Sequence, residues 1–198
     1  MRSIIGLFAC ALALTAQTYP PPFPREAARL LFENNRVAVW DVTWPKGQPT
    51  AMHVHPVDQL SVTLVKGTVR VTRLGGTPTV GGAEPGGVVF TPQGTVHMEE
   101  GLSDIPQRKI MLQLKASATQ SEDKAGSYPG AVKLLENNRV VAWDYTWKPG
   151  NKTSGEGGNR DSVIVFLDGN VVYSPRNAPP HIADAIKEPR RSVIVELK

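Results

Sequence analysis

An internal repeat constrains the fold of this 198-residue chain more than any other feature. The segment 33–44 recurs at 136–147, with nine of twelve positions identical at an offset of 103 residues. The segments 106–115 and 189–198 also resemble each other, and both end in Leu-Lys. Similarity at a fixed offset indicates a duplicated domain. We therefore predict one domain at 25–117 and a second at 131–198, joined by a linker at 118–130 that is rich in Ser, Gly and charge.

Both copies have the residue pattern of short strands between turns. Alternating or β-branched apolar runs predict strands at Val37–Trp44, Gln59–Val65, Thr68–Thr72, Val88–Phe90 and Lys109–Leu114. The 18 glycines and 17 prolines favour many turns over long helices, and any helix is confined to 25–31. Many short strands with glycine-containing turns are typical of an all-β barrel or sandwich. We predict two tandem β-barrels, the second of them shorter.

The amino-terminal residues have the pattern of an export signal. Arg2 precedes an apolar run from Ile4 to Leu14, which is too short to span a bilayer but typical of a signal peptide, here predicted as residues 1–16. A periplasmic or secreted protein, with no stable membrane insertion after cleavage, is therefore expected. Cys10 is the single cysteine and leaves with the signal, unless it is lipidated. The proline-rich arm at 17–24 should lie extended on the surface or on a neighbouring subunit.

Three histidines form the candidate metal site. His53 and His55 are alternate residues of an extended segment, so their imidazoles point the same way. His97 follows a Gly-Pro-Gly pattern, in a segment that a barrel can bring beside the first two histidines. Neutral imidazole is a common protein ligand for Zn, Cu, Fe and Ni ions.

The order of these residues resembles the cupin superfamily. Gly47, His53 and His55 match its first motif, while the second motif is matched by Gly86, Pro92, Gly94 and His97. The resemblance covers nearly the whole mature chain as a bicupin, and it implies two jelly-roll barrels with one divalent metal ion held in the first. It also implies a small-molecule ligand or substrate, and it leaves a homo-oligomer open.

The chain departs from the cupin pattern at the acidic ligand. Gln59 occupies that position, and Asp58 is the alternative fourth ligand. Three neutral imidazoles and an amide would leave the charge of a divalent ion uncompensated, which favours Lewis-acid chemistry and attracts carboxylates or enolates. Zn or Cu is the expected ion by the usual affinity order, with Fe, Mn and Ni as alternatives.

The second copy lacks this ligand set. At the same offset, Glu156 and Gly158 replace the paired histidines, and His181 stands alone. Residues that both copies share are expected to be scaffold; these are Arg36, Trp40, Asp41, Trp44 and Arg108 with their counterparts. We interpret the second copy as a structural partner that covers a barrel edge.

These observations support an exported metal-dependent enzyme of lyase, isomerase or dioxygenase type, acting on a small oxygenated or anionic molecule. The alternative is a non-catalytic cupin module that binds a small ligand or a metal. Glu99 and Glu100 could serve as acid or base, although a solvated turn is the favoured interpretation of this pair. The net charge is +4, but Lys and Arg are scattered, so we expect no nucleic-acid partner.

Overall fold

The computed structural model describes residues 18–115, 128–149, 160–177, 182 and 186–198. The predicted signal peptide and most of the predicted linker lie outside them. The first copy contains β1 (Ala28–Glu33), β2 (Val37–Trp44), β3 (His53–Val54), β4 (Asp58–Val65), β5 (Val69–Arg73), β6 (Thr79–Gly81), β7 (Val88–Thr91), β8 (Val96–Gly101) and β9 (Gln107–Leu114). The second contains β10 (Val132–Glu136), β11 (Val140–Trp147), β12 (Ser162–Phe166), β13 (Val171–Ser174) and β14 (Arg190–Leu197). In this part of the chain, no helix is long and apolar enough to cross a membrane.

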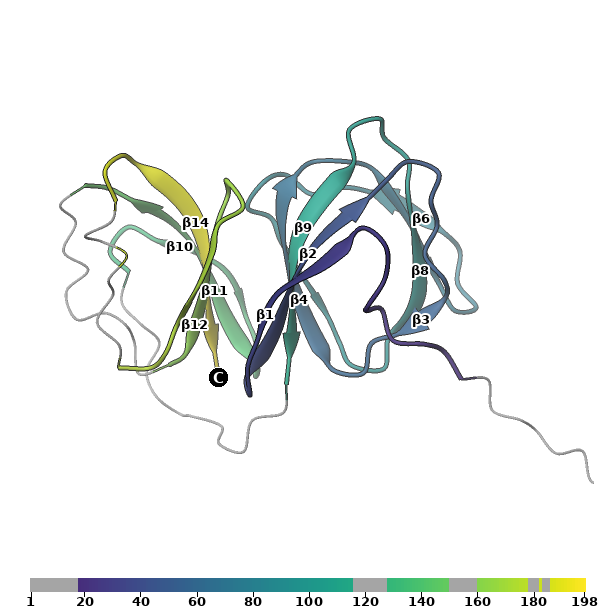
Figure 1. The fold of residues 1–198 in the computed structure, drawn as a ribbon, viewed down its shortest axis with the longest axis horizontal. Helices are drawn as coiled ribbons and strands as arrows, with labels where there is room; N and C mark the ends of the chain where they lie inside the picture. Colours follow the sequence, from purple (N-terminus) through teal and green to yellow (C-terminus); the bar gives the residue numbers. More distant parts are fainter. Residues whose placement is uncertain (1–17, 116–127, 150–159, 178–181, 183–185) are drawn as a thin grey trace, which may run out of the picture.

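The strands form three sheets, which confirms the predicted all-β fold. The first copy has a five-stranded sheet in the order β1-β2-β9-β4-β7, the inner sheet, and a four-stranded sheet in the order β3-β8-β5-β6, the outer sheet. The second copy has one five-stranded sheet, β10-β11-β14-β12-β13. The repeat therefore extends to topology, since β10, β11, β12 and β14 correspond to β1, β2, β4 and β9. The second-copy sheet and the outer sheet lie on either side of the inner sheet (Figure 1).

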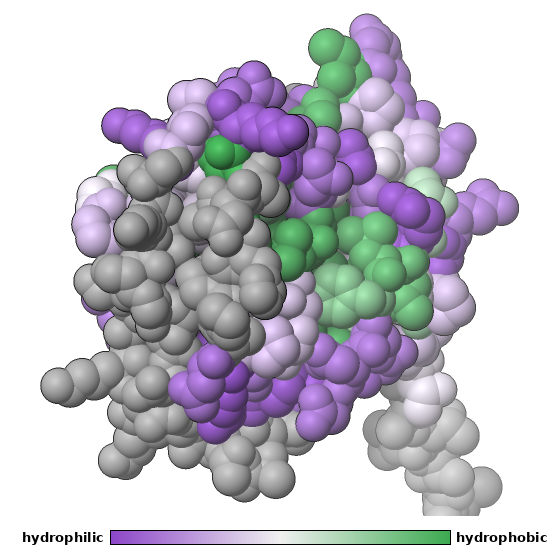
Figure 2. All heavy atoms as spheres, turned by 60° about the vertical axis from the view of Figure 1, so that its left-hand side comes forward, coloured by the Kyte–Doolittle hydropathy of each residue, from purple (hydrophilic) through white to green (hydrophobic). Residues whose placement is uncertain are grey.

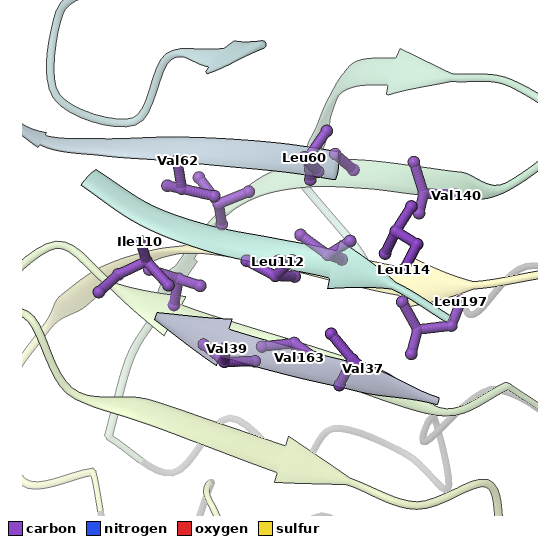
Figure 3. Close-up of a cluster of buried hydrophobic side chains, with 14 of the residues drawn as sticks. Val37, Val39, Leu60, Val62, Ile110, Leu112, Leu114, Val140, Val163 and Leu197 are labelled. Carbon is purple, nitrogen blue, oxygen red and sulfur yellow. The ribbon is translucent and has the colours of Figure 1, made fainter. Parts of the chain in front are cut away.

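The largest apolar core lies between the inner sheet and the second-copy sheet. Alternate residues of β4, such as Leu60 and Val62, face it because successive side chains of a strand point to opposite faces. Val140, Val163 and Leu197 of the second copy belong to the same buried cluster, and Figure 3 shows side chains of both copies meeting. The second copy thus covers a whole sheet face, rather than the barrel edge that the sequence led us to expect.

Two equivalent arginines form ion pairs and hydrogen bonds between the two copies. Arg36 of the first copy bonds to Asp161 at 3.1 Å and donates to the carbonyl oxygens of Leu197 and Lys198. In the same way, Arg139 of the second copy bonds to Asp58 at 2.9 Å and donates to the carbonyl oxygens of Leu114 and Lys115. Each acceptor has its counterpart in the other copy, so an approximate two-fold axis relates the two sheets.

The opposite face of the inner sheet looks into the first barrel. Val42, Trp44, Val69 and Met111 are buried there together with Phe23. The proline-rich arm is therefore more than a surface segment: Phe23 stacks on Trp40 with a centroid distance of 4.8 Å, and the Val54 amide donates to the Pro20 carbonyl oxygen. The short helix allowed at 25–31 is not formed, because Ala28–Glu33 pairs with β2 as a strand.

The far face of the second-copy sheet is filled by large apolar side chains. Ile164, Phe166 and Ile194 are buried there, at the positions that Ser61, Thr63 and Met111 occupy in the first copy. In the described ranges the second copy forms no counterpart of the outer sheet. Hydrophobic side chains also gather in one area of the side on which this copy comes forward (Figure 2). The second copy therefore keeps the packing face of the fold and fills its interior.

Candidate metal centre

Strand pairing in the outer sheet assembles the three histidines. His53 of β3 lies directly opposite His97 of β8, and alternation brings His55 to the same side as His53. A turn at 92–95 precedes His97: Gly94 has a φ of +81°, and its amide donates to the His55 carbonyl oxygen. A glycine suits this left-handed conformation, which explains why the second motif carries one.

The geometry of the triad fits a shared metal ion. One ring nitrogen of each histidine lies within 4.8 Å of those of the other two, and all three residues are buried. His55 Nε2 and His97 Nε2 are 3.0 Å apart, below the limit of about 4.2 Å for two nitrogens that each lie about 2.1 Å from one ion. The 4.8 Å that encloses all three nitrogens is slightly above this limit, so the rings would turn a little on binding an ion. His53 Nδ1 lies 2.9 Å from the Ala51 carbonyl oxygen, an outer contact that fixes the ring and leaves Nε2 for a ligand.

Burial keeps two of these imidazoles neutral. It is the main cause that lowers the pKa of His55 to about 4, with smaller contributions from His97 and His53. Burial also lowers the pKa of His97 to about 4, helped by His53 and Arg73. Neutral imidazole is the form that binds metal, so the site is ready for an ion at neutral pH.

Gln59 and Asp58 point in different directions. Gln59 is 1% exposed, and its Oε1 is buried without a hydrogen-bond partner in the described structure. It lines the same cavity as His97. Asp58 instead accepts a hydrogen bond from the Gln93 amide at 2.8 Å and pairs with Arg139 at the contact between the copies. An unpartnered buried oxygen beside a histidine triad is what a fourth ligand would present, so the donor set of the first copy fits a metal ion.

A cavity of about 580 Å³ opens beside the triad inside the first barrel. Its walls are partly apolar, with Val69, Val71, Val89 and Met111 among them. Its charged lining consists of Arg73, Glu99 and Lys109. Trp44 Nε1 donates to Glu99 Oε2 at 2.9 Å, which holds that carboxylate in place. The cavity therefore combines ionisable groups, an apolar surface and a candidate metal ligand.

Lys109 and Arg73 were not predicted from the sequence, although one signal was present. In the aligned copies, Arg108 matches Arg191 whereas Lys109 matches Ser192. Residues 108 and 109 point to opposite faces of the sheet. The position that is the same in both copies, 108, belongs to the scaffold, and the position that differs, 109, faces the cavity. Glu99 was named as a candidate, and the structure places it in the cavity. Glu156, Gly158 and His181 of the second copy lie outside the described residues.

Comparison with known proteins supports the fold. No family model and no curated protein matches the chain. Among solved structures, AerE from Microcystis aeruginosa is similar over 91% of this chain and 99% of its own, with a TM-score of 0.65 and 11% identity. A cupin 2 conserved barrel domain protein from Leptotrichia buccalis is similar over 89% of this chain and 92% of its own, with a TM-score of 0.50 and 10% identity.

A single cupin domain from Bordetella pertussis aligns over its full length with 51% of this chain, at 22% identity and a TM-score of 0.43. The similarities to the Microcystis and Leptotrichia proteins, by contrast, extend across both copies. Together with the three antiparallel sheets, they show that this chain has the cupin fold.

Proposed function

We propose that the first copy is a metal-dependent enzyme that acts on a small oxygenated or anionic molecule, by lyase, isomerase or dioxygenase chemistry. His53, His55, His97 and Gln59 would hold one divalent ion, with Zn or Cu favoured over Fe, Mn or Ni. The observation that carries the proposal is the buried histidine triad beside a cavity with an ionisable lining. A bound ion would act as a Lewis acid toward a substrate oxygen.

Glu99 favours an enzyme over a non-catalytic binding module. The two alternatives differ in whether an acid or base lies near the metal ligands, and Glu99 lies in the cavity close enough to affect the pKa of His55. Trp44 occupies Oε2, which leaves Oε1 as the oxygen that can accept a proton from a substrate. A carboxylate held in this way is suited to general acid–base catalysis.

Elemental analysis of protein purified without a histidine tag tests the metal site. We expect about one divalent ion per chain and close to none in His53→Ala. Two ions per chain, or metal that remains after this change, would contradict the assignment. Purification from the native periplasm, without added metal, also tests export, which we propose from the signal-like residues 1–16. Stoichiometric iron or manganese together with oxygen uptake would favour the dioxygenase alternative over Lewis-acid chemistry.

A further inference from the structure

Lys109 is a cation that lines the cavity, and no carboxylate of the described residues lies within hydrogen-bonding distance of it. No hydrogen bond or ion pair joins it to another described side chain, and its Nζ lies 5.8 Å from the centre of the Trp44 ring. The contact with the ring is at the limit of a cation–π interaction and supplies no counter-ion. Burial lowers the pKa of this lysine, an effect that the Glu99 carboxylate partly offsets. A half-buried ammonium group of this kind is suited to an anionic ligand.

The second copy serves as an internal control for this position. Arg108, next in the chain, pairs with Asp41, and its counterpart Arg191 pairs with Asp144 in the same way. These arginines belong to the scaffold. At position 109 the second copy instead has Ser192, whose hydroxyl accepts a hydrogen bond from Trp147 Nε1. The fold therefore does not need a lysine here, and the lysine occurs only in the copy that has the histidine triad and the open cavity.

The surroundings of Lys109 narrow the class of ligand. The cavity offers apolar walls at Val69, Val71 and Met111, together with polar groups at Ser61 and Gln107. Lys109 faces it from the inner sheet, whereas His97 reaches it from the outer sheet. The candidate ligand Gln59 also belongs to the inner sheet, but Lys109 lies opposite Thr63, four residues along β4 from Gln59. Four residues of a strand span about 13 Å, so a ligand would meet the metal ligands at one end and the ammonium group at the other. The cavity volume of about 580 Å³ is in the range of small-molecule sites.

We propose that Lys109 binds the carboxylate of the substrate and thereby selects small organic acids over neutral molecules of the same shape. This inference rests on the proposed function, because it assigns the substrate class of that site. Lys109 is a positioning residue here: it holds the end of the substrate remote from the metal ligands.

Binding of butyrate and butyramide to the zinc-loaded full chain tests the proposal. The two probes have nearly the same shape but differ in charge. NMR titration should give a Kd for butyrate at least tenfold below that for butyramide. In Lys109→Met this ratio should fall at least about fivefold, because only the zinc ion and Arg73 are left to attract the anion, while Lys109→Arg should retain most of it. Lys66→Met, which removes an exposed lysine paired with Glu84, is the matched control and should leave the ratio unchanged.

Zinc content measured on the same samples separates this proposal from the metal assignment. One ion per chain in Lys109→Met, together with the expected fall in the preference for butyrate, supports both. A preference for butyrate that is as large in Lys109→Met as in the wild type, or a wild-type protein that binds the two probes equally or not at all, would overturn the role of Lys109. If Lys109→Met is unfolded by circular dichroism, Lys109→Gln replaces it, with the same expected loss. Absence of zinc from the wild-type chain would instead contradict the metal site.

Discussion

The two inter-copy arginines provide a matched pair of perturbations. Arg36→Met and Arg139→Met each remove a guanidinium that bonds to an aspartate and to two backbone carbonyl oxygens of the other copy. The aspartates also have equivalent second roles. Asp58 accepts the amide of Gln93, in the turn that leads to His97, and Asp161 accepts the amide of Arg176. The first turn serves the candidate metal centre, whereas the second copy lacks the paired histidines.

The expected losses of stability follow from burial. Side chains of the Arg36–Asp161 pair are 9% and 10% exposed, so Arg36→Met should lower the free energy of unfolding by about 3 kcal/mol. The Arg139–Asp58 pair is 25% and 18% exposed, and Arg139→Met should cost about 2 kcal/mol because solvent screens the charge left behind. Arg29→Met is the control: its arginine is 74% exposed and pairs with Asp41 at 3.4 Å, so the change should stay within about 0.5 kcal/mol.

Metal affinity should separate the two variants. Without Arg139, Asp58 loses its ion-pair partner and holds the turn before His97 less firmly. Zinc affinity should therefore fall by up to about tenfold, which is the low end of the effects of outer contacts at metal sites. Arg36→Met should leave zinc affinity within about twofold of the wild type, since its partner supports a turn of the second copy. Urea unfolding of the metal-free protein and zinc competition with a chromophoric chelator measure the two quantities. Equal effects of both variants on zinc affinity, or a cost below about 1 kcal/mol for Arg36→Met, would refute this reasoning.

Three further predictions concern the site and the arm. The metal-free protein should lose stability as the pH falls from about 6.5 to about 4, because two histidines, His55 and His97, take up protons in the unfolded state but not in the folded state. Urea unfolding across this pH range should show a decline of about 1 to 3 kcal/mol in the free energy of unfolding. A free energy that does not change with pH would contradict the lowered pKa values. Gln59→Glu should tighten zinc binding and weaken butyrate binding by adding a negative ligand, whereas unchanged zinc affinity would argue against Gln59 as a ligand. Phe23→Ala should cost about 3 kcal/mol through loss of a buried, stacked ring, and a cost below about 1 kcal/mol in thermal unfolding would show that the arm does not contribute to the barrel.

The sequence was a good guide where local pattern and spacing decide the structure. The apolar alternation of Gln59–Val65 predicted a strand, and β4 spans Asp58–Val65. The alternation of His53 and His55 predicted two imidazoles on one side of a strand, because this pattern follows from the two-residue period of a strand. The resemblance to the cupin motifs added His97, and the structure brings all three histidines together.

Features set by contacts between distant segments were harder to predict. The arm that contains Phe23 was expected on the surface or on a neighbouring subunit, because a proline-rich run carries no signal for the aromatic surface on which it packs. The second copy was expected to cover a barrel edge, whereas its sheet covers a sheet face. The sequence could not show this, because Val163 and Val195 have the pattern of ordinary strand residues whatever surface they pack against. Lys109 was overlooked for a related reason: a lysine in an edge or surface strand has the same local pattern as one that faces a cavity.

The approximate two-fold axis has a consequence for assembly. Arg36 and Asp58 both come from the first copy. The face that this copy presents to the second copy therefore carries the arginine of one ion pair and the aspartate of the other. Such a face is self-complementary, as in a two-fold symmetric homodimer. The duplicated chain is therefore a dimer closed within one molecule, in which the effective concentration of one half at the other is fixed by covalent connection. The contact between the two copies should therefore not depend on protein concentration. The second copy can also change in sequence on the sheet face turned away from the first copy, because that face does not form the contact.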